Sequence, residues 1–327
     1  MKNRHYEDLF KDFEDRKERY IARKYVISLF ESKDFLVIGP DSSTSLHFIF
    51  EGESKLMRAA IRQVALLSHF PNFDESTEAN KTRLTVIGRN ESDQYLGNLL
   101  KAKDIVLDVD VEFVNPSNSK DLLESKDKNT FIIRESDLSA VILSKEEMTI
   151  DLETAINVNM VYNIGVDVDY LPAFDFPNVK RYGTAINVFR HRYSDEDKLE
   201  KWNSLSDTIK LSNLYCADCL KVRYRWLASA KDGVTKSLSK HINALALSEH
   251  SRWNVEKLIL GYRPLSETER YEFSALHDSE RDSYRKRKRD SEKAHVDLCS
   301  YHDLKRINPK DMRYDYFLIL AIPEILK

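Results

Sequence analysis

Hydrophobic positions follow two periods in the first part of the chain. Short apolar runs that suit buried strands are followed by polar turns and then by segments whose apolar residues recur every three or four positions. The strand-like runs are 46–50, 84–89, 109–114, 130–133 and 185–189, and the helix-like segments are 55–69, 93–101 and 149–161. Strands that alternate with helices predict an α/β domain whose parallel sheet is covered on both faces.

The segments on either side of this region have the helical period alone. Residues 1–32 carry apolar positions at helical spacing among mixed charges, which predicts an amphipathic helix packed on the body or on a partner chain. Beyond residue 195, the segments 197–225 and 236–260 predict long helices, with Asp232 and Gly233 as a helix stop between them. The predicted parts are a helix over 1–32, an α/β domain over 33–195 and a mostly α-helical domain over 196–327.

The strand, turn and helix at 46–60 lie where a dinucleotide-binding fold carries its glycine-rich turn. Gly52 is the one glycine of this turn, and Lys55 stands where the third glycine would be. Gly52, Ser54 and the helix N-terminus can hold a phosphate through free amides, with Lys55 adding charge. Arg89, at the end of the second strand, is either a surface arginine or a residue that favours a phosphorylated ribose or another anion. The region is thus predicted to be a Rossmann-like domain whose cleft either binds a nucleotide or has lost its ligand.

The cysteines give little indication of metal or redox chemistry. Cys216 and Cys219 form a CxxC pair, but no second pair or HxxxH motif accompanies them, and zinc needs about four ligands. Their context predicts the middle of a helix, so both are expected to be buried as small hydrophobic residues. No metal cofactor is expected.

Composition limits the partners. A net charge of −3 gives no overall attraction to nucleic acid or to an anionic membrane. No apolar run approaches the ~20 residues of a membrane helix. The N-terminus also lacks the apolar core of a signal peptide. These features predict a cytoplasmic protein.

The last quarter of the chain carries the most distinctive motif. Residues 249–257 are Glu-His-Ser-Arg-Trp-Asn-Val-Glu-Lys, and Gly261 and Tyr262 follow them. A second block, over 293–304, contains Lys293, His295 and Tyr301. This pattern resembles the RyR module, which is named for the repeats of ryanodine receptors and also occurs in soluble bacterial proteins. The segment 46–60 resembles the TrkA N-terminal nucleotide-binding domain that some bacterial RyR proteins carry upstream.

The RyR-like block contains the leading candidate site. His250, Trp253 and Lys257 fall at i, i+3 and i+7 and therefore share one helix face. An aromatic plane beside a cation and an imidazole suits a purine base with a phosphate. Alternatively, Trp253 is a core anchor with His250 as its hydrogen-bonded neighbour. The resemblance extends the expected ligand-binding set, which is His250, Trp253, Lys257, Tyr262, Lys293, His295 and Tyr301. It also matches Asp315 to an acidic residue of the family.

A charged insert, 265–292, separates the two halves of the motif. Its basic run, 285–289, can bind phosphate backbones, but acidic neighbours nearly cancel its charge. A solvated helical arm is therefore the preferred interpretation, and nucleic acid is not an expected partner. Its position between the two blocks suits a lid over the pocket or a contact between subunits.

These patterns support three hypotheses of function. The leading one is a non-enzymatic sensor of a small nucleotide-type ligand in the RyR-like pocket, with signalling or antiviral defence as the context that the resemblance implies. The second is a nucleotide hydrolase or NADP-linked oxidoreductase that uses Gly52, Ser54 and Arg89. The third is a self-assembly module without ligand, built on 1–32 and 265–292. The chain has no GxSxG, HExxH or Walker motif, so no set of catalytic residues is expected. The protein is expected to form a homo-oligomer.

Overall fold

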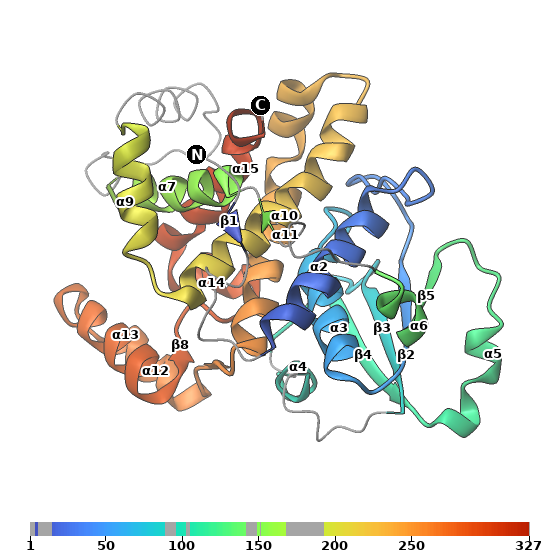
Figure 1. Ribbon diagram of the computed structural model, residues 1–327. Helices are drawn as coiled ribbons and strands as arrows, with labels where there is room; N and C mark the ends of the chain where they lie inside the picture. Colours follow the sequence, from blue (N-terminus) through green and yellow to red (C-terminus); the bar gives the residue numbers. More distant parts are fainter. Residues whose placement is uncertain are drawn as a thin grey trace.

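The chain combines a four-stranded parallel sheet with a body of long helices, which lie side by side in Figure 1. This arrangement is that of a computed structural model. The residues that it describes are 4–5, 15–88, 96–102, 105–141, 149–150, 152–167 and 193–326. The strand expected over 185–189 lies outside the described residues.

The sheet is formed by the short apolar runs of the first half. Its strands are β2 (His47–Glu51), β3 (Thr82–Ile87), β4 (Val109–Val114) and β5 (Thr130–Arg134), in the order β4-β3-β2-β5 with every pair parallel. The register places Phe48 opposite Leu84 on one side and Phe131 on the other. The predicted α/β class with a parallel sheet is therefore confirmed.

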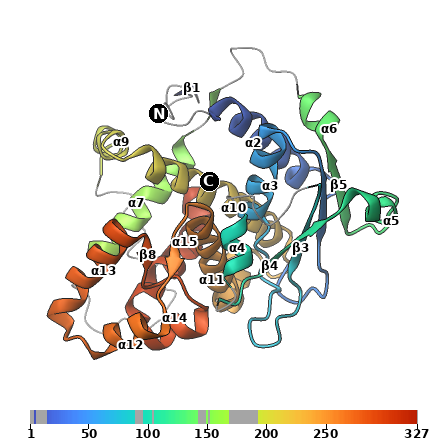
Figure 2. The same ribbon diagram turned by 90° about the horizontal axis from the view of Figure 1, so that it is seen from below.

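Two helices pack on one face of this sheet, α2 (Arg16–Glu31) and α3 (Lys55–Leu67) (Figures 1 and 2). The hydroxyl of Ser54 caps α3 by accepting a hydrogen bond from the amide of Met57 at 3.0 Å. Phe30 of α2 stacks on Phe48 of β2 with a centroid distance of 5.6 Å. The opposite face mixes polar and apolar side chains, since Nε2 of His47 lies 2.7 Å from the hydroxyl of Thr85 there, beside the fully buried Ile49.

The segment after the sheet differs from the prediction. Thr149 and Ile150 form a short strand, β6 (Thr149–Ile150), which pairs antiparallel with β1 (Arg4–His5). The prediction that a helix begins at residue 149 is therefore wrong, because the helix, α7, runs over Glu153–Asp167. Smaller elements complete this half of the chain: α4 (Gly97–Lys101), η1 (Pro116–Asn118), α5 (Lys120–Leu123) and α6 (Glu135–Ser139).

The helical body is built on α10 (Asp207–Ser229), α11 (Val234–Ile259) and α15 (Met312–Ile325). The prediction of a single helix over 197–225 is wrong, because the segment forms two helices. The first, α9 (Asp195–Asn203), ends ahead of Ser206, whose hydroxyl accepts a hydrogen bond from the amide of Ile209 and caps α10. Gly233 precedes α11 with φ +78°, a conformation that glycine adopts without strain. One hydrophobic core extends from Phe48 in the sheet to Phe317 in α15.

The insert forms the predicted helical arm, a hairpin of α12 (Glu267–Ala275) and α13 (Asp278–Glu292). It leaves the body at β7 (Arg263–Pro264) and returns at β8 (Ala294–His295), two strands that pair in parallel. The chain then continues through α14 (Tyr301–Ile307) and η4 (Pro309–Asp311). None of the described helices combines the length and apolar character needed to cross a membrane.

Candidate functional site

A cavity of about 280 Å³ lies in the helical body, where α7, α11, α13 and α15 meet the segment that follows β8. Figure 2 shows these elements together on one side of the molecule. The wall of the cavity combines aromatic, cationic and carboxylate side chains. The residues that line it are Tyr162, His250, Trp253, Arg285, Arg289, His295, Val296, Asp297, Leu304, Asp311, Tyr314 and Asp315.

Three of the expected ligand-binding residues line this cavity. His250 and Trp253 come from adjacent turns of α11, and their rings stack with centroids 5.9 Å apart and an interplanar angle of 20°. His295, from β8, meets Trp253 edge to face at 4.8 Å. The two halves of the sequence motif therefore come together around one indole ring.

The other expected residues lie outside the cavity wall. Nζ of Lys257 lies 5.5 Å from the ring centroid of Trp253, and Tyr262 meets His295 edge to face at 6.3 Å. Tyr301 packs on His250 at 5.4 Å. These three residues form a second layer behind the wall, whereas Lys293 ends α13 in the left-handed conformation, with φ +47°.

His250 is held as an imidazolium. Its Nε2 donates to the carbonyl of Cys299 at 2.9 Å, and its Nδ1 lies 3.5 Å from Oδ2 of Asp315. Burial alone would lower the pKa of His250, but the contacts with Asp315 and Cys299 outweigh burial and raise it to about 10. Burial also raises the pKa of Asp315 to about 6, although His250 opposes that shift. At neutral pH this corner of the cavity is an ion pair.

His295 is neutral. Burial lowers its pKa to about 3, and the nearby charges of Lys257 and Arg289 act in the same direction. A neutral imidazole has one nitrogen that donates and one that accepts a hydrogen bond. The amide of Asp297 donates to Nδ1 of His295 at 3.3 Å, which leaves Nε2 as the nitrogen that donates. The two cavity histidines therefore offer different chemistry, a fixed cation at His250 and a neutral donor at His295.

A pair of carboxylates occupies another part of the wall. Nδ2 of Asn308 donates to Oδ1 of Asp297 and to Oδ2 of Asp311, both at 2.7 Å. Burial raises the pKa of Asp311 to about 6, and the charge of Asp297 adds to that shift. Nη1 of Arg285 lies 3.3 Å from Oδ2 of Asp311. These oxygens can accept hydrogen bonds from the hydroxyl or amino groups of a ligand.

Several residues of the wall were missed at the sequence level. Arg285 and Arg289 belong to the basic run of the insert, and their i, i+4 spacing was the signal that they share a helix face. Tyr162 of α7 and Tyr314 of α15 pack together at 6.2 Å but lie far from the motif in the chain. No local pattern relates those two tyrosines to the site.

A buried network of charges supports the site from behind. Arg252 is fully buried and donates through Nε to Glu249 at 2.8 Å and through Nη1 to Glu256 at 2.6 Å. Arg223 of α10 donates to Glu249 at 2.7 Å. Arg252 and Lys257 outweigh the effect of burial and lower the pKa of Glu256 to about 2. The motif over 249–257 thus has two sides, of which one faces the cavity and the other joins α11 to α10.

The second candidate site, at the end of β2, is surrounded by carboxylates. Gly52 has φ +147°, and a Cβ placed on it would lie 2.5 Å from Oε2 of Glu135. A Cβ on Gly88 would lie 2.8 Å from Oε1 of Glu53. The hydroxyl of Ser54 accepts from its own helix, and Lys55 is exposed. Arg89 lies outside the described residues. Negative charge in this position disfavours a bound phosphate.

The cysteines and possible metal ligands point to structural roles. Cys216 and Cys219 lie within α10 as buried free thiols, and burial raises the pKa of Cys219 to about 11. Their placement agrees with the expected small hydrophobic residues. Within the part of the chain that the structure describes, no three histidine, cysteine or carboxylate side chains cluster as a metal site.

A scan against protein-family models gave no match, and neither the search of curated proteins nor that of solved structures found a similar protein. The fold defines a protein of the α/β class with a parallel sheet and an attached helical body. What the cavity binds must follow from the residues that line it.

Proposed function

We propose that this chain is a binding protein, without catalytic activity, for a small nucleotide-type ligand held in the cavity of the helical body. The observation that carries the proposal is the convergence of Trp253, His295, Arg285 and Arg289 on one cavity. The resemblance of the C-terminal motif to the RyR module points in the same direction. It also suggests a role in signalling, with antiviral defence as one setting.

The chemistry of the wall suits the parts of a nucleotide. The indole of Trp253 offers a flat apolar surface to a base, and such stacking contributes about 1–3 kcal/mol. The neutral imidazole of His295 and the carboxylates of Asp297 and Asp311 can bond to the edge of the base or to ribose hydroxyls. The guanidinium groups of Arg285 and Arg289 suit a phosphate.

The size of the cavity narrows the ligand further. Its volume of about 280 Å³ lies just below the ~300–1,000 Å³ that ligand sites in proteins usually span. A single nucleotide suits this space better than a dinucleotide. The alternative, an enzyme that uses the cleft at Gly52, is disfavoured by the acidic side chains around that glycine.

Trp253→Ala will weaken nucleotide binding by about tenfold or more, because it removes the stacking surface while leaving the charged groups in place. The measurement is isothermal titration calorimetry with adenine and guanine nucleotides, including cyclic and ADP-ribose types. Trp226→Ala is the matched control, since Trp226 packs beside His241 and does not line the cavity. If none of these nucleotides gives binding heat with the unaltered protein, the proposed function is wrong.

A further inference from the structure

The arm brings two arginines to the cavity. Arg281, Arg285 and Arg289 follow one another at i, i+4 on α13 and so lie on one face of the helix. Arg285 and Arg289 line the cavity. Lys286 and Arg287 belong to the same basic run, but both are exposed and neither lines the cavity. The basic run therefore has an inner and an outer side, which the net charge of the insert conceals.

The two lysines of the expected ligand-binding set do not line the cavity. Lys257 donates to the buried carboxylate of Glu256 at 3.1 Å, and its ammonium group lies between the rings of Trp253 and Tyr262. It acts as a positioning residue for the indole. Lys293 is not part of the cavity wall, and its Nζ lies 3.9 Å from where a Cβ on Gly261 would be.

The two arginines retain hydrogen-bonding capacity toward the cavity. Arg289 donates through Nε to Asp290 at 2.8 Å, and none of the described residues accepts from its Nη1 or Nη2. Arg285 contacts Asp311 through Nη1, while its Nε is buried and has no partner among the described residues. A guanidinium group recognises a phosphate through two parallel hydrogen bonds. Arg289 can offer such a pair through Nη1 and Nη2.

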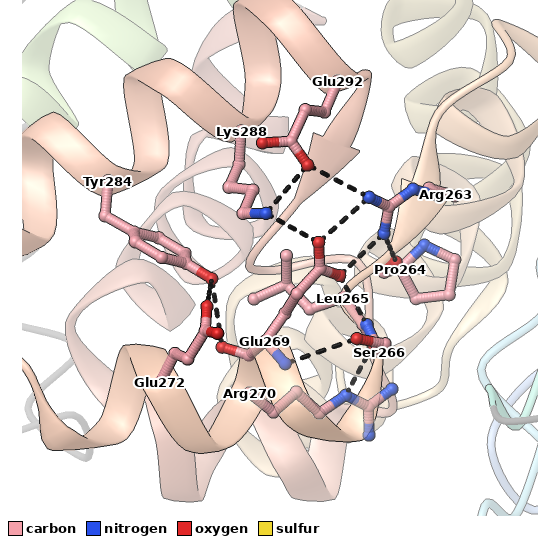
Figure 3. A network of polar contacts seen from close by, with 10 residues as sticks. All are labelled: Arg263, Pro264, Leu265, Ser266, Glu269, Arg270, Glu272, Tyr284, Lys288 and Glu292. Carbon is pink, nitrogen blue, oxygen red and sulfur yellow. Dashed lines mark hydrogen bonds and ion pairs between the residues drawn. The ribbon is translucent and has the colours of Figure 1, made fainter.

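The arm is fixed in place by an ionic network at its base (Figure 3). Glu269 of α12 accepts from Arg263 at 2.7 and 3.0 Å and from Lys288 of α13 at 2.7 Å. Glu292 accepts from Lys288 at 2.8 Å and from Arg263 at 3.3 Å. This network ties both helices of the arm to the strand that leaves the body. It therefore holds the inner arginines at the cavity before any ligand enters.

We propose that Arg285 and Arg289 bind the phosphate of the ligand, so that the insert selects a nucleoside monophosphate over the corresponding nucleoside. This inference rests on the proposed function and assigns the anionic end of the same site. Two arginines one helical turn apart have Cβ atoms ~6 Å apart, so their guanidinium groups can hold one phosphate between them. A second phosphate would extend into solvent, where ionic contacts add little.

The test compares adenosine with adenosine 5′-monophosphate, diphosphate and triphosphate by isothermal titration calorimetry, with the guanosine series run in parallel. The first phosphate is expected to raise affinity about tenfold or more, and each further phosphate to change it less than about threefold. Arg289→Gln removes most of that gain and leaves adenosine or guanosine binding unchanged. Lys286→Gln removes one charge from the outer side of the same helix and keeps the gain.

Two results separate this inference from the proposed function. If nucleoside and monophosphate bind equally well, or if Lys286→Gln and Arg289→Gln lose the same affinity, the assignment to the inner arginines is wrong while nucleotide binding stands. If no nucleoside or nucleotide gives heat, both proposals fail. Arg285→Gln provides a second variant, and a denaturation curve shows whether losing its contact with Asp311 has loosened the arm.

Discussion

Arg252→Met will lower the free energy of unfolding by about 3–5 kcal/mol, because it removes one partner from a buried ionic network. Methionine retains much of the volume of the arginine, so the loss reports the missing charge more than a cavity. Glu249 keeps Arg223 as a partner, and Glu256 keeps Lys257 and Ser212. The loss is nevertheless large, since all these carboxylate oxygens lie away from water.

Chemical denaturation followed by circular dichroism measures this change. Lys236→Met is the matched control, because Lys236 lies on the same helix and pairs with Asp232 at 2.9 Å at the surface. Exposed pairs of this kind contribute at most about 1 kcal/mol. If the two variants unfold at the same denaturant concentration, the network over α10 and α11 does not stabilise the body as described.

Much of the fold could be predicted from local patterns. The run at 46–50 lies within one residue of β2, because a buried parallel strand is short and continuously apolar. The run at 109–114 coincides with β4, an edge strand in which apolar residues alternate with acidic ones in the first four positions. The long helix over 236–260 was found from its period in the same way. Local patterns failed at Ser206, where a capping serine divides one amphipathic stretch into two helices. They also failed at Thr149, whose strand depends on a partner near the N-terminus.

The site was predictable only in part. His250 and Trp253 share a helix face by spacing alone, and the structure places both at the cavity. The contribution of Arg285 and Arg289 was hidden, because the net charge of the insert does not show that these two arginines line the cavity while none of the insert's acidic residues does. Tyr162 reaches the wall from α7, which lies far from the motif in the chain and joins it only through the tertiary fold.

The sheet and the site are also joined by a contact that no motif indicates. The carboxylate of Glu75, in the loop between α3 and β3, accepts from the amides of Tyr301 at 2.6 Å and His302 at 3.0 Å. Tyr301 in turn packs on His250. The first turn of α14 is therefore held by the α/β part of the chain, and it supports the imidazolium of the cavity from behind.

The imidazolium of His250 makes stability depend on pH in a window that can be measured. The pKa of His250 is about 10 in the folded protein, and about 6.5 is usual for an unfolded chain. Its contribution is fully present below the lower value and is lost as the pH rises through the upper one. Between about pH 7 and pH 9 the loss is about 1.4 kcal/mol per pH unit, or about 3 kcal/mol in total.

Denaturation curves for the unaltered protein and for His250→Gln, collected across this pH range, isolate that contribution. The difference between the two is expected to shrink by up to about 3 kcal/mol from pH 7 to pH 9, since titrating groups that do not contact His250 cancel in the comparison. Removing the imidazolium raises the pKa of the buried Asp315 in the variant, and this titration reduces the change. In the unaltered protein, Asp315 changes the free energy of unfolding at lower pH, between about pH 4 and pH 6, because its pKa in the folded protein is about 6. His241→Gln, on the same helix but beside Trp226, is the control. Parallel curves for the unaltered protein and His250→Gln would show that His250 is not protonated in the folded state.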